Sequence, residues 1–208
     1  MNSALRIALY ALTEHVKCSS DEIEKNIIGF GLFASVASAT VGSITGAGPL
    51  VATAITTACV YAMYYRLAKL TNIGISQNIL KSVASAVLAN LVSNIGVSIV
   101  AAFAISFIPV IGNLSSSTIC AIVQFASVYV AGYVFISTLN ALYKKHGNIS
   151  GLTEKEIKEA VAETNSSINT SEIINEAKKV HKEVKNNKEY SDLSEFETLV
   201  NEAKKDVE

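Results

Sequence analysis

Charged side chains are almost absent from the central part of this sequence. Between Asn26 and Tyr143 only Arg66, Lys69 and Lys81 are charged, and no Asp, Glu or His occurs there. A soluble domain carries about 25% charged residues, so roughly 30 are expected over a segment of this length. The deficit argues against an ordinary soluble domain. It also leaves the segment without an acid pair or a histidine for general acid–base catalysis, so we expect a protein that is not an enzyme.

The sequence also lacks the features of several ligand-binding classes. The three cysteines, Cys18, Cys59 and Cys120, show no paired spacing, so neither a disulfide framework nor a zinc site is expected. There is no basic stripe interleaved with aromatic residues, which argues against nucleic acid as a partner. The run from Gly42 to Gly48 lacks the lysine of a phosphate-binding loop. We therefore expect no metal and no cofactor. The first residues also lack the pattern of a cleaved secretory signal.

Two long uncharged runs, Asn26 to Tyr65 and Ser82 to Tyr143, fill the centre of the chain instead. A helix needs about 20 apolar residues to cross a bilayer, so each run has room for two crossings. Each run is interrupted once by a turn signal, at Gly46 to Pro49 and at Pro109 to Asn113. The sequence therefore predicts an all-α, multi-pass membrane bundle of two hydrophobic hairpins.

The hairpins divide the chain into three regions. Residues 1–25 form an N-terminal amphipathic helix and cap, residues 26–147 a four-helix membrane domain, and residues 148–208 a charged helical tail. The four crossings are expected at about Ile27–Gly46, Leu50–Tyr65, Val83–Phe107 and Thr118–Tyr143. The second is short, and whether it spans fully is left open. With four crossings, all basic residues near the membrane lie on the same side of it as the two termini. We therefore expect a bacterial inner-membrane protein with both termini in the cytoplasm.

Two sets of small and polar residues lie inside the predicted crossings. Small residues at four-residue spacing let helices approach closely in lipid, either within one hairpin or along a dimer seam; we favour packing within the hairpin. This set is Gly31, Ser35, Ser38, Gly42 and Gly46. The amides of Asn90, Asn94 and Gln124 need partners that lipid cannot supply. We favour hydrogen bonds between helices over a polar pathway, with Gln124 as the candidate partner of the two asparagines.

Aromatic and basic residues gather at the predicted cytoplasmic boundary. An aromatic belt followed by basic residues is typical of a membrane interface, although an ordinary buried aromatic cluster has the same composition. The predicted interface anchors are Tyr61, Tyr64, Tyr65, Arg66, Lys69, Lys81, Lys144 and Lys145.

The tail carries apolar residues at steps of three and four, which indicate amphipathic helices. The stripes include Ile173, Val180, Val184, Phe196 and Val200. We expect the tail to fold as a helical hairpin, to self-associate, or to bind a partner helix. His181 is expected on a solvated face of the tail.

Short motifs in the apolar region resemble those of a known family. They are Met63, Arg66, Leu67, Ala68 and Leu70, with Pro109, Gly112 and Gly132. This pattern resembles the YcjF-like bacterial membrane family, a domain of unknown function with paired apolar hairpins that is often fused to, or encoded beside, a GTPase. The resemblance covers roughly Ile28 to Gly147, and Val60 stands where the family usually has Gln. It implies a GTPase partner in trans, not nucleotide hydrolysis by this chain.

Three functions are consistent with these features. The first is a non-enzymatic membrane protein that anchors or scaffolds a partner through its tail. The second is a channel or transporter with a weakly polar interior. The third is a soluble helical protein that shelters its hairpins and inserts later, as pore formers do.

Overall fold

The chain is built from α-helices throughout the part that the structure describes. The computed structural model describes residues 3–41, 48–91 and 116–207, and these ranges contain no strand. The prediction of an all-α fold is confirmed. The helices are α1 (Ala4–Thr13), α2 (Ser20–Val41), α3 (Gly48–Leu70), α4 (Gln77–Asn90), α6 (Ser116–His146), α7 (Glu154–Ser167), α8 (Thr170–Val184) and α9 (Ser194–Val207), with a 3-10 turn at Lys188–Tyr190.

Polar side chains mark where several helices begin. The Ser3 hydroxyl accepts the Arg6 amide at 3.1 Å at the start of α1, and the Ser19 hydroxyl accepts the Glu22 amide at 3.1 Å beside α2. Thr153 and Glu156 form a complete capping box at α7. These bonds satisfy amide groups that have no partner within the first helical turn. The joint after α3 turns at Asn72, which has a φ of 52°.

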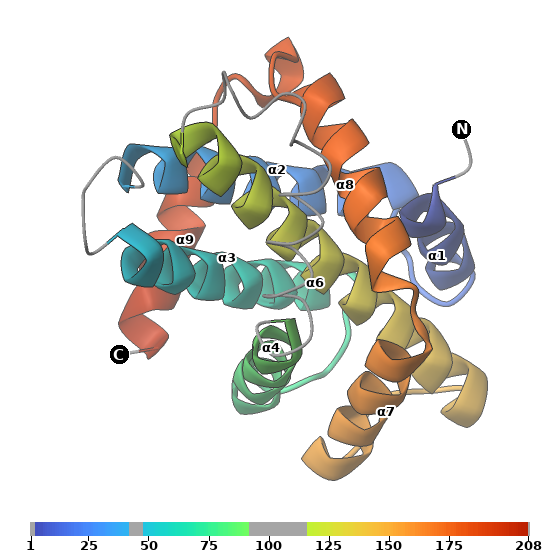
Figure 1. Cartoon of the computed structure of the whole chain (residues 1–208). Helices are drawn as coiled ribbons and strands as arrows, with labels where there is room; N and C mark the ends of the chain where they lie inside the picture. The colour runs from blue at the N-terminus through green and yellow to red at the C-terminus, as the bar shows by residue number, and fades with distance from the viewer. Residues whose placement is uncertain (1–2, 42–47, 92–115, 208) are drawn as a thin grey trace.

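Helices α2, α3 and α6 form the centre of the molecule, and the other helices surround them (Figure 1). Helix α6 packs against both α2 and α3. Large side chains from all three helices are fully buried there, including Phe30, Tyr64 and Phe125. Burial of such side chains contributes about 1.5–3 kcal/mol each, so this apolar centre dominates the stability of the fold.

The tail helices pack on the apolar helices and do not form a separate body. Helix α8 lies against α6, α7 against α6 and α4, and α9 against α3 and α2. The apolar stripe of the tail is used in these contacts: Ile173, Phe196 and Val200 are buried. Val180 and Val184 are partly buried against the same core. The predicted helices of the tail are confirmed, and their apolar faces are covered by residues of the same chain.

One helix in the described ranges is long and apolar enough to cross a membrane. It runs from Thr118 to His146, with a mean hydropathy of 2.0, and 56% of its most apolar window is buried within the protein. The core helix of a soluble protein can have the same composition. Helix α2 begins with charged residues and α3 carries three threonines, which lower their hydropathy. The prediction of four crossings therefore goes beyond the described structure. Most of the predicted third crossing, residues 92–107, lies outside it.

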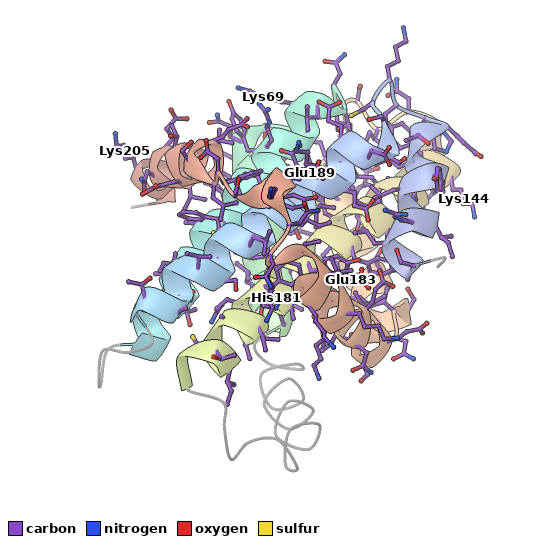
Figure 2. The ribbon with its side chains drawn as sticks, turned by 90° about the horizontal axis from the view of Figure 1, so that it is seen from above. Lys69, Lys144, His181, Glu183, Glu189 and Lys205 are labelled. Atoms are coloured by element: carbon purple, nitrogen blue, oxygen red, sulfur yellow. The ribbon has the colours of Figure 1, made fainter. Side chains whose placement is uncertain are left out.

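The molecule has an uncharged side and a charged side. The end of α2 and the first turns of α3 and α6 lie together in Figure 2, away from the labelled Lys69, Lys144 and Lys205. This arrangement follows from the sequence, since charged residues are missing from 26–65 and from 82–143.

Candidate functional site

Helix α8 makes polar contacts with the apolar part of the molecule, and these contacts form the most distinctive site in the described residues. The Asn169 side chain caps α8 by accepting the Glu172 amide. The inward face of the helix buries Ile173, Ile174 and Ala177. Two titratable residues lie beside this apolar stripe on the helix surface. Glu176 is three positions after Ile173, and His181 is four positions after Ala177. We call Glu176 and His181, with the groups that they contact, the α8 interface.

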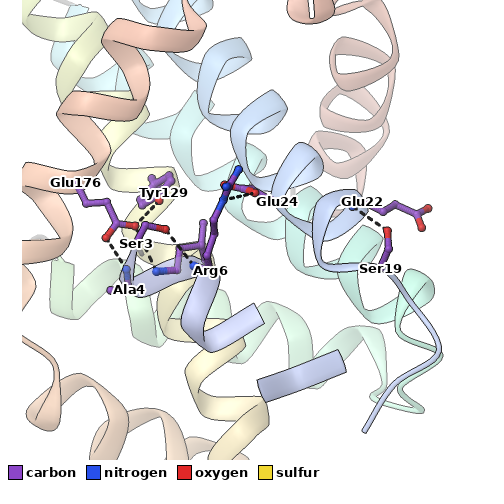
Figure 3. Close-up of polar contacts among 9 residues, drawn as sticks. Ser3, Ala4, Arg6, Ser19, Glu22, Glu24, Tyr129 and Glu176 are labelled. Atoms are coloured by element: carbon purple, nitrogen blue, oxygen red, sulfur yellow. Dashed lines mark hydrogen bonds and ion pairs between the residues drawn. The ribbon is translucent and has the colours of Figure 1, made fainter. Parts of the chain in front are cut away.

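Glu176 joins α8 to two other helices. Its carboxylate accepts the Ala4 amide at 2.8 Å, the Leu5 amide at 3.3 Å and the Tyr129 hydroxyl at 2.6 Å (Figure 3). Ala4 and Leu5 form the first turn of α1, where amides have no helical partner and the helix dipole attracts a negative charge. Tyr129 comes from the middle of α6. One carboxylate thus holds the tail, the N-terminal helix and the longest apolar helix together.

An ion pair fixes α1 from its other side. The Arg6 guanidinium donates from Nε to both carboxylate oxygens of Glu24 on α2, at 3.1 Å (Figure 3). The Glu24 side chain is only 12% exposed, whereas that of Arg6 is 54% exposed. A carboxylate buried to this degree is costly without a partner charge, and Arg6 supplies that charge.

His181 lies between α8 and the two apolar helices that it covers. Its Nε2 is 3.1 Å from the Ser35 hydroxyl of α2, and its ring centroid is 4.9 Å from that of Phe125 on α6. Burial lowers the pKa of His181 to about 4, and the charge of Lys185 adds to this effect. The imidazole is therefore neutral at neutral pH. The prediction that His181 lies on a solvated face is wrong, because its ring packs between α8, α2 and α6. The charged residues around it in the sequence gave no sign of these contacts.

The predicted small residues that the structure describes lie at helix contacts within the chain. A methyl group at Gly31 would approach the Phe125 ring to 3.0 Å, so glycine allows α6 to pack closely there. Ser35 contacts His181, and Ser38 is fully buried. Gly42 and Gly46 lie outside the described residues. The described members contact α6 and α8 of the same chain, which lie outside the predicted hairpin, so packing of this set within that hairpin stays a prediction.

Two further glycines at helix contacts were missed. A methyl group at Gly132 would come within 2.8 Å of Ile27 Cγ2, and one at Gly29 would overlap the Phe196 ring. Gly29 precedes Gly31 by two positions and so points to another side of α2, toward α9. Spacing along one face of the helix could not identify it.

The polar residues of the predicted crossings have a different arrangement from the expected one. The Gln124 side-chain oxygen accepts the Thr56 hydroxyl, so it joins α6 to α3. Asn90 is the last residue of α4, but its side chain is not among the described parts of the structure. Asn94 lies outside the described residues. Pairing of Gln124 with either asparagine stays a prediction. The Thr56 contact is a hydrogen bond between helices, but the choice between such bonds and a polar pathway for the two asparagines stays a prediction.

Two of the three aromatic residues of the predicted interface lie in the core, and Tyr65 is partly buried against it. Tyr64 is fully buried, its hydroxyl donates to the Ala131 carbonyl at 2.9 Å, and its ring stacks on Phe135 at 4.3 Å. Tyr61 is 3% exposed. The arrangement matches the alternative of a buried aromatic cluster.

Two basic residues of the predicted interface contact aromatic rings of the same group. Lys69 Nζ lies 4.4 Å from the centroid of the Tyr65 ring, and Lys81 Nζ lies 5.6 Å from that of Tyr61. Arg66 pairs with Glu195 of α9 at 3.0 Å, which ties the tail to the end of α3. Lys144 and Lys145 are exposed at the end of α6.

The described residues hold no group of three or more His, Cys, Asp or Glu side chains that could bind a metal. A cavity of about 580 Å³ lies beside the α8 interface, among α1, α2 and α8. Charged residues of both signs line this cavity. Four of them are paired with one another, as Arg6 with Glu24 and Lys25 with Glu189. The arrangement is suited to holding helices together.

Comparison with family models, curated proteins and solved structures gives no match for this chain. The resemblance to the YcjF-like family therefore stays a prediction. The all-α fold agrees with that resemblance, but a helical fold is shared by too many families to test it.

Proposed function

We propose that this chain is a non-enzymatic membrane protein that anchors or scaffolds a partner at a lipid bilayer. The observation that carries the proposal is the complete absence of Asp, Glu, His, Lys and Arg from Ser82 to Tyr143, a stretch that includes nearly all of α6. Charged residues are costly in the hydrocarbon core, and a segment without them is compatible with lipid over its whole length.

The distribution of basic residues supports a particular orientation within this proposal. Lys144 and Lys145 lie in the last turn of the most apolar helix, and Arg66, Lys69 and Lys81 lie between the two uncharged runs. With four crossings, these groups and both termini share one side, which the positive-inside rule assigns to the cytoplasm. A bacterial inner membrane fits this arrangement.

The tail is the part of the proposed anchor that is available to a partner. Its apolar stripe is already covered by α6, α3 and α2. Because Glu176 of α8 contacts Tyr129 in the middle of α6, a membrane-spanning α6 requires the tail to leave it, and a partner would then contact the uncovered apolar stripe. A GTPase in trans is the partner class that the family resemblance implies.

Alkaline carbonate extraction of membranes from cells that express the full chain tests the proposal. Carbonate strips peripheral proteins, whereas helices held in the hydrocarbon core stay in the pellet. We expect the protein in the pellet, and its release into the supernatant would refute membrane integration.

Cysteine labelling tests the orientation. Burial and the contact with Glu22 raise the pKa of Cys18 to about 11, so its thiol is a slow target for maleimide. A better probe is Ala162→Cys on the exposed face of α7, with Cys18, Cys59 and Cys120 replaced by serine. An impermeant maleimide should label this variant only after the inner membrane is opened. Labelling of intact spheroplasts would contradict a cytoplasmic tail.

A second candidate is a protein that shelters its apolar helices until it meets a membrane. The observation in its favour is that α8 and α9 bury their apolar faces on the central helices, and that 56% of the most apolar window of α6 is buried. This candidate requires a monodisperse protein without detergent, which becomes carbonate-resistant only after vesicles are added. Aggregation without detergent would contradict it and favour the constitutive anchor.

A further inference from the structure

Helix α8 lies against α6 well inside its apolar stretch. The His181 ring contacts Phe125, and the Glu176 carboxylate accepts the Tyr129 hydroxyl. Both α6 residues belong to the stretch Thr118–His146, which is apolar enough to cross a membrane. The outer face of α8 carries exposed lysine and glutamate side chains, which are costly in the hydrocarbon core. The contacts that hold α8 on α6 therefore control whether α6 is available to lipid.

His181, which is labelled in Figure 2, lies in this contact without an opposite charge beside it. Its Nε2 is 3.1 Å from Ser35 Oγ of α2, and its ring lies against Phe125 of α6. Helix α2 has no charged residue after Lys25, and α6 has none before Lys144, so neither helix offers a carboxylate to the ring. A protonated imidazole would be an unpaired charge in apolar surroundings, which is unfavourable.

The charged neighbours of His181 on its own helix are basic. Lys178 and Lys185 lie three positions before it and four positions after it, on the same side of α8. Glu183 is two positions away and therefore faces another side, and Glu176 is held by α1 and α6. The docked position therefore disfavours the protonated ring from every side that packs on it. Accordingly, burial and the charge of Lys185 lower the pKa of His181 to about 4.

The segments at the two ends of α8 suit a movement of this helix. Asn169, between α7 and α8, is exposed, and so are residues 185–189 after α8. Exposed polar segments open more readily than buried ones. Helix α7 has its own contacts with α6 and α4, and α9 has its own with α3 and α2, so neither depends on α8.

We propose that the α8 interface is an acid-operated latch: protonation of His181 separates α8 from α2 and α6 and so permits α6 to enter a bilayer. This inference rests on the proposed membrane function. Once α8 leaves, the ring regains its ordinary pKa of 6.5, so the released form takes up the proton first as the pH falls. The docked form is fully favoured above pH 6.5, and release grows as the pH falls toward 4. At pH 5 we expect the released population to be about tenfold higher than at pH 7.

Thiol accessibility tests the latch without a membrane. Ala177 is 0% exposed on the inward face of α8. In the full chain with its three native cysteines replaced, Ala177→Cys therefore reacts with a methanethiosulfonate only when α8 is released. Its rate is divided by that of Ala162→Cys on the exposed face of α7, which removes the pH dependence of the thiol reaction. We expect this ratio to rise about tenfold from pH 7 to pH 5, and to stay constant when His181→Gln is added.

Vesicle integration tests the consequence of release. The full chain is mixed with vesicles of phosphatidylcholine and phosphatidylglycerol at pH 7 and at pH 5, and the carbonate-resistant fraction is followed over time. We expect the wild-type protein to integrate about tenfold faster at pH 5, and His181→Gln to integrate at similar rates at the two pH values. The matched control, His146→Gln, should behave as the wild type, since His146 is exposed at the end of α6. Titration of the lipid affects all three proteins alike.

The two measurements separate failure of the latch from failure of the membrane function. A constant labelling ratio together with carbonate resistance would overturn the latch and leave the membrane function standing. A rising ratio without carbonate resistance at either pH would refute the membrane function and, with it, the consequence proposed for the latch. An equal acid response in His181→Gln would assign the release to other groups and overturn the role of His181.

Discussion

The contact of His181 with Ser35 and Phe125 predicts that acid weakens the docking of α8. In the folded protein the pKa of His181 is lowered from 6.5 to about 4, chiefly by burial. Protonation is therefore easier in the unfolded chain than in the folded one. The stabilisation is fully present above pH 6.5 and is lost progressively as the pH falls toward 4.

The size of this effect follows from the pKa difference. A shift of this size corresponds to about 3 kcal/mol for a fully enclosed group. His181 is only partly enclosed, and water screens its charge, so we expect about 1–2 kcal/mol. The groups that face it from the neighbouring helices, Ser35 and Phe125, carry no charge, and Lys185 opposes its protonation. In a chain of this length such a change lowers the Tm by about 3–6 °C.

Thermal unfolding of the full chain between pH 7 and pH 4 measures this loss. The informative comparison is with His181→Gln, which keeps a hydrogen-bonding side chain but cannot take up a proton in this range. Contributions from all other titrating groups cancel in the difference between the two proteins. His146→Gln is the matched control, since His146 is exposed at the end of α6 and should follow the wild-type profile.

The expected result is that the wild-type protein loses about 3–6 °C more than His181→Gln on acidification. If the two profiles stay parallel from pH 7 to pH 4, His181 does not titrate between the helices, and the reasoning is refuted.

Two further substitutions test the packing around the central helices. Glu176→Gln should lower the free energy of unfolding by about 1–2 kcal/mol, because a charge-assisted contact with the first turn of α1 is lost. Chemical denaturation measures this, and an equal loss in the exposed control Glu172→Gln would contradict it. Gly132→Leu should cost about 2 kcal/mol, because even a methyl group comes within 2.8 Å of Ile27. Gly74→Leu has free space and should stay near neutral, so similar losses at the two glycines would refute a packing role.

Local sequence signals predicted many of the helices. The capping box of Thr153 and Glu156 at the start of α7 is a signal of this local kind, since its two residues are three positions apart. Steps of three and four residues from Ile173 to Val184 predicted α8 and its apolar face. These signals act within one or two helical turns, where the geometry of the helix determines which side chains meet. Such signals can be read without knowing the fold.

The α8 interface could not be read in this way. Glu176 contacts Ala4 across a separation of 172 positions, and His181 contacts Ser35 across 146. Both lie among lysines and glutamates, as residues on a solvated face do. Tyr64 was equally ambiguous, because an aromatic residue beside basic ones suits a membrane boundary and a buried cluster alike.

The sequence by itself determined the helical class and the uncharged character of residues 82–143, because both depend on composition and on short-range periodicity. Only the tertiary structure decided that the tail covers α6, α3 and α2 instead of extending away from them. The physical reason is that apolar burial has no direction and does not specify a partner. An apolar stripe shows that a helix must be covered, whereas the spatial arrangement of the helices determines what covers it.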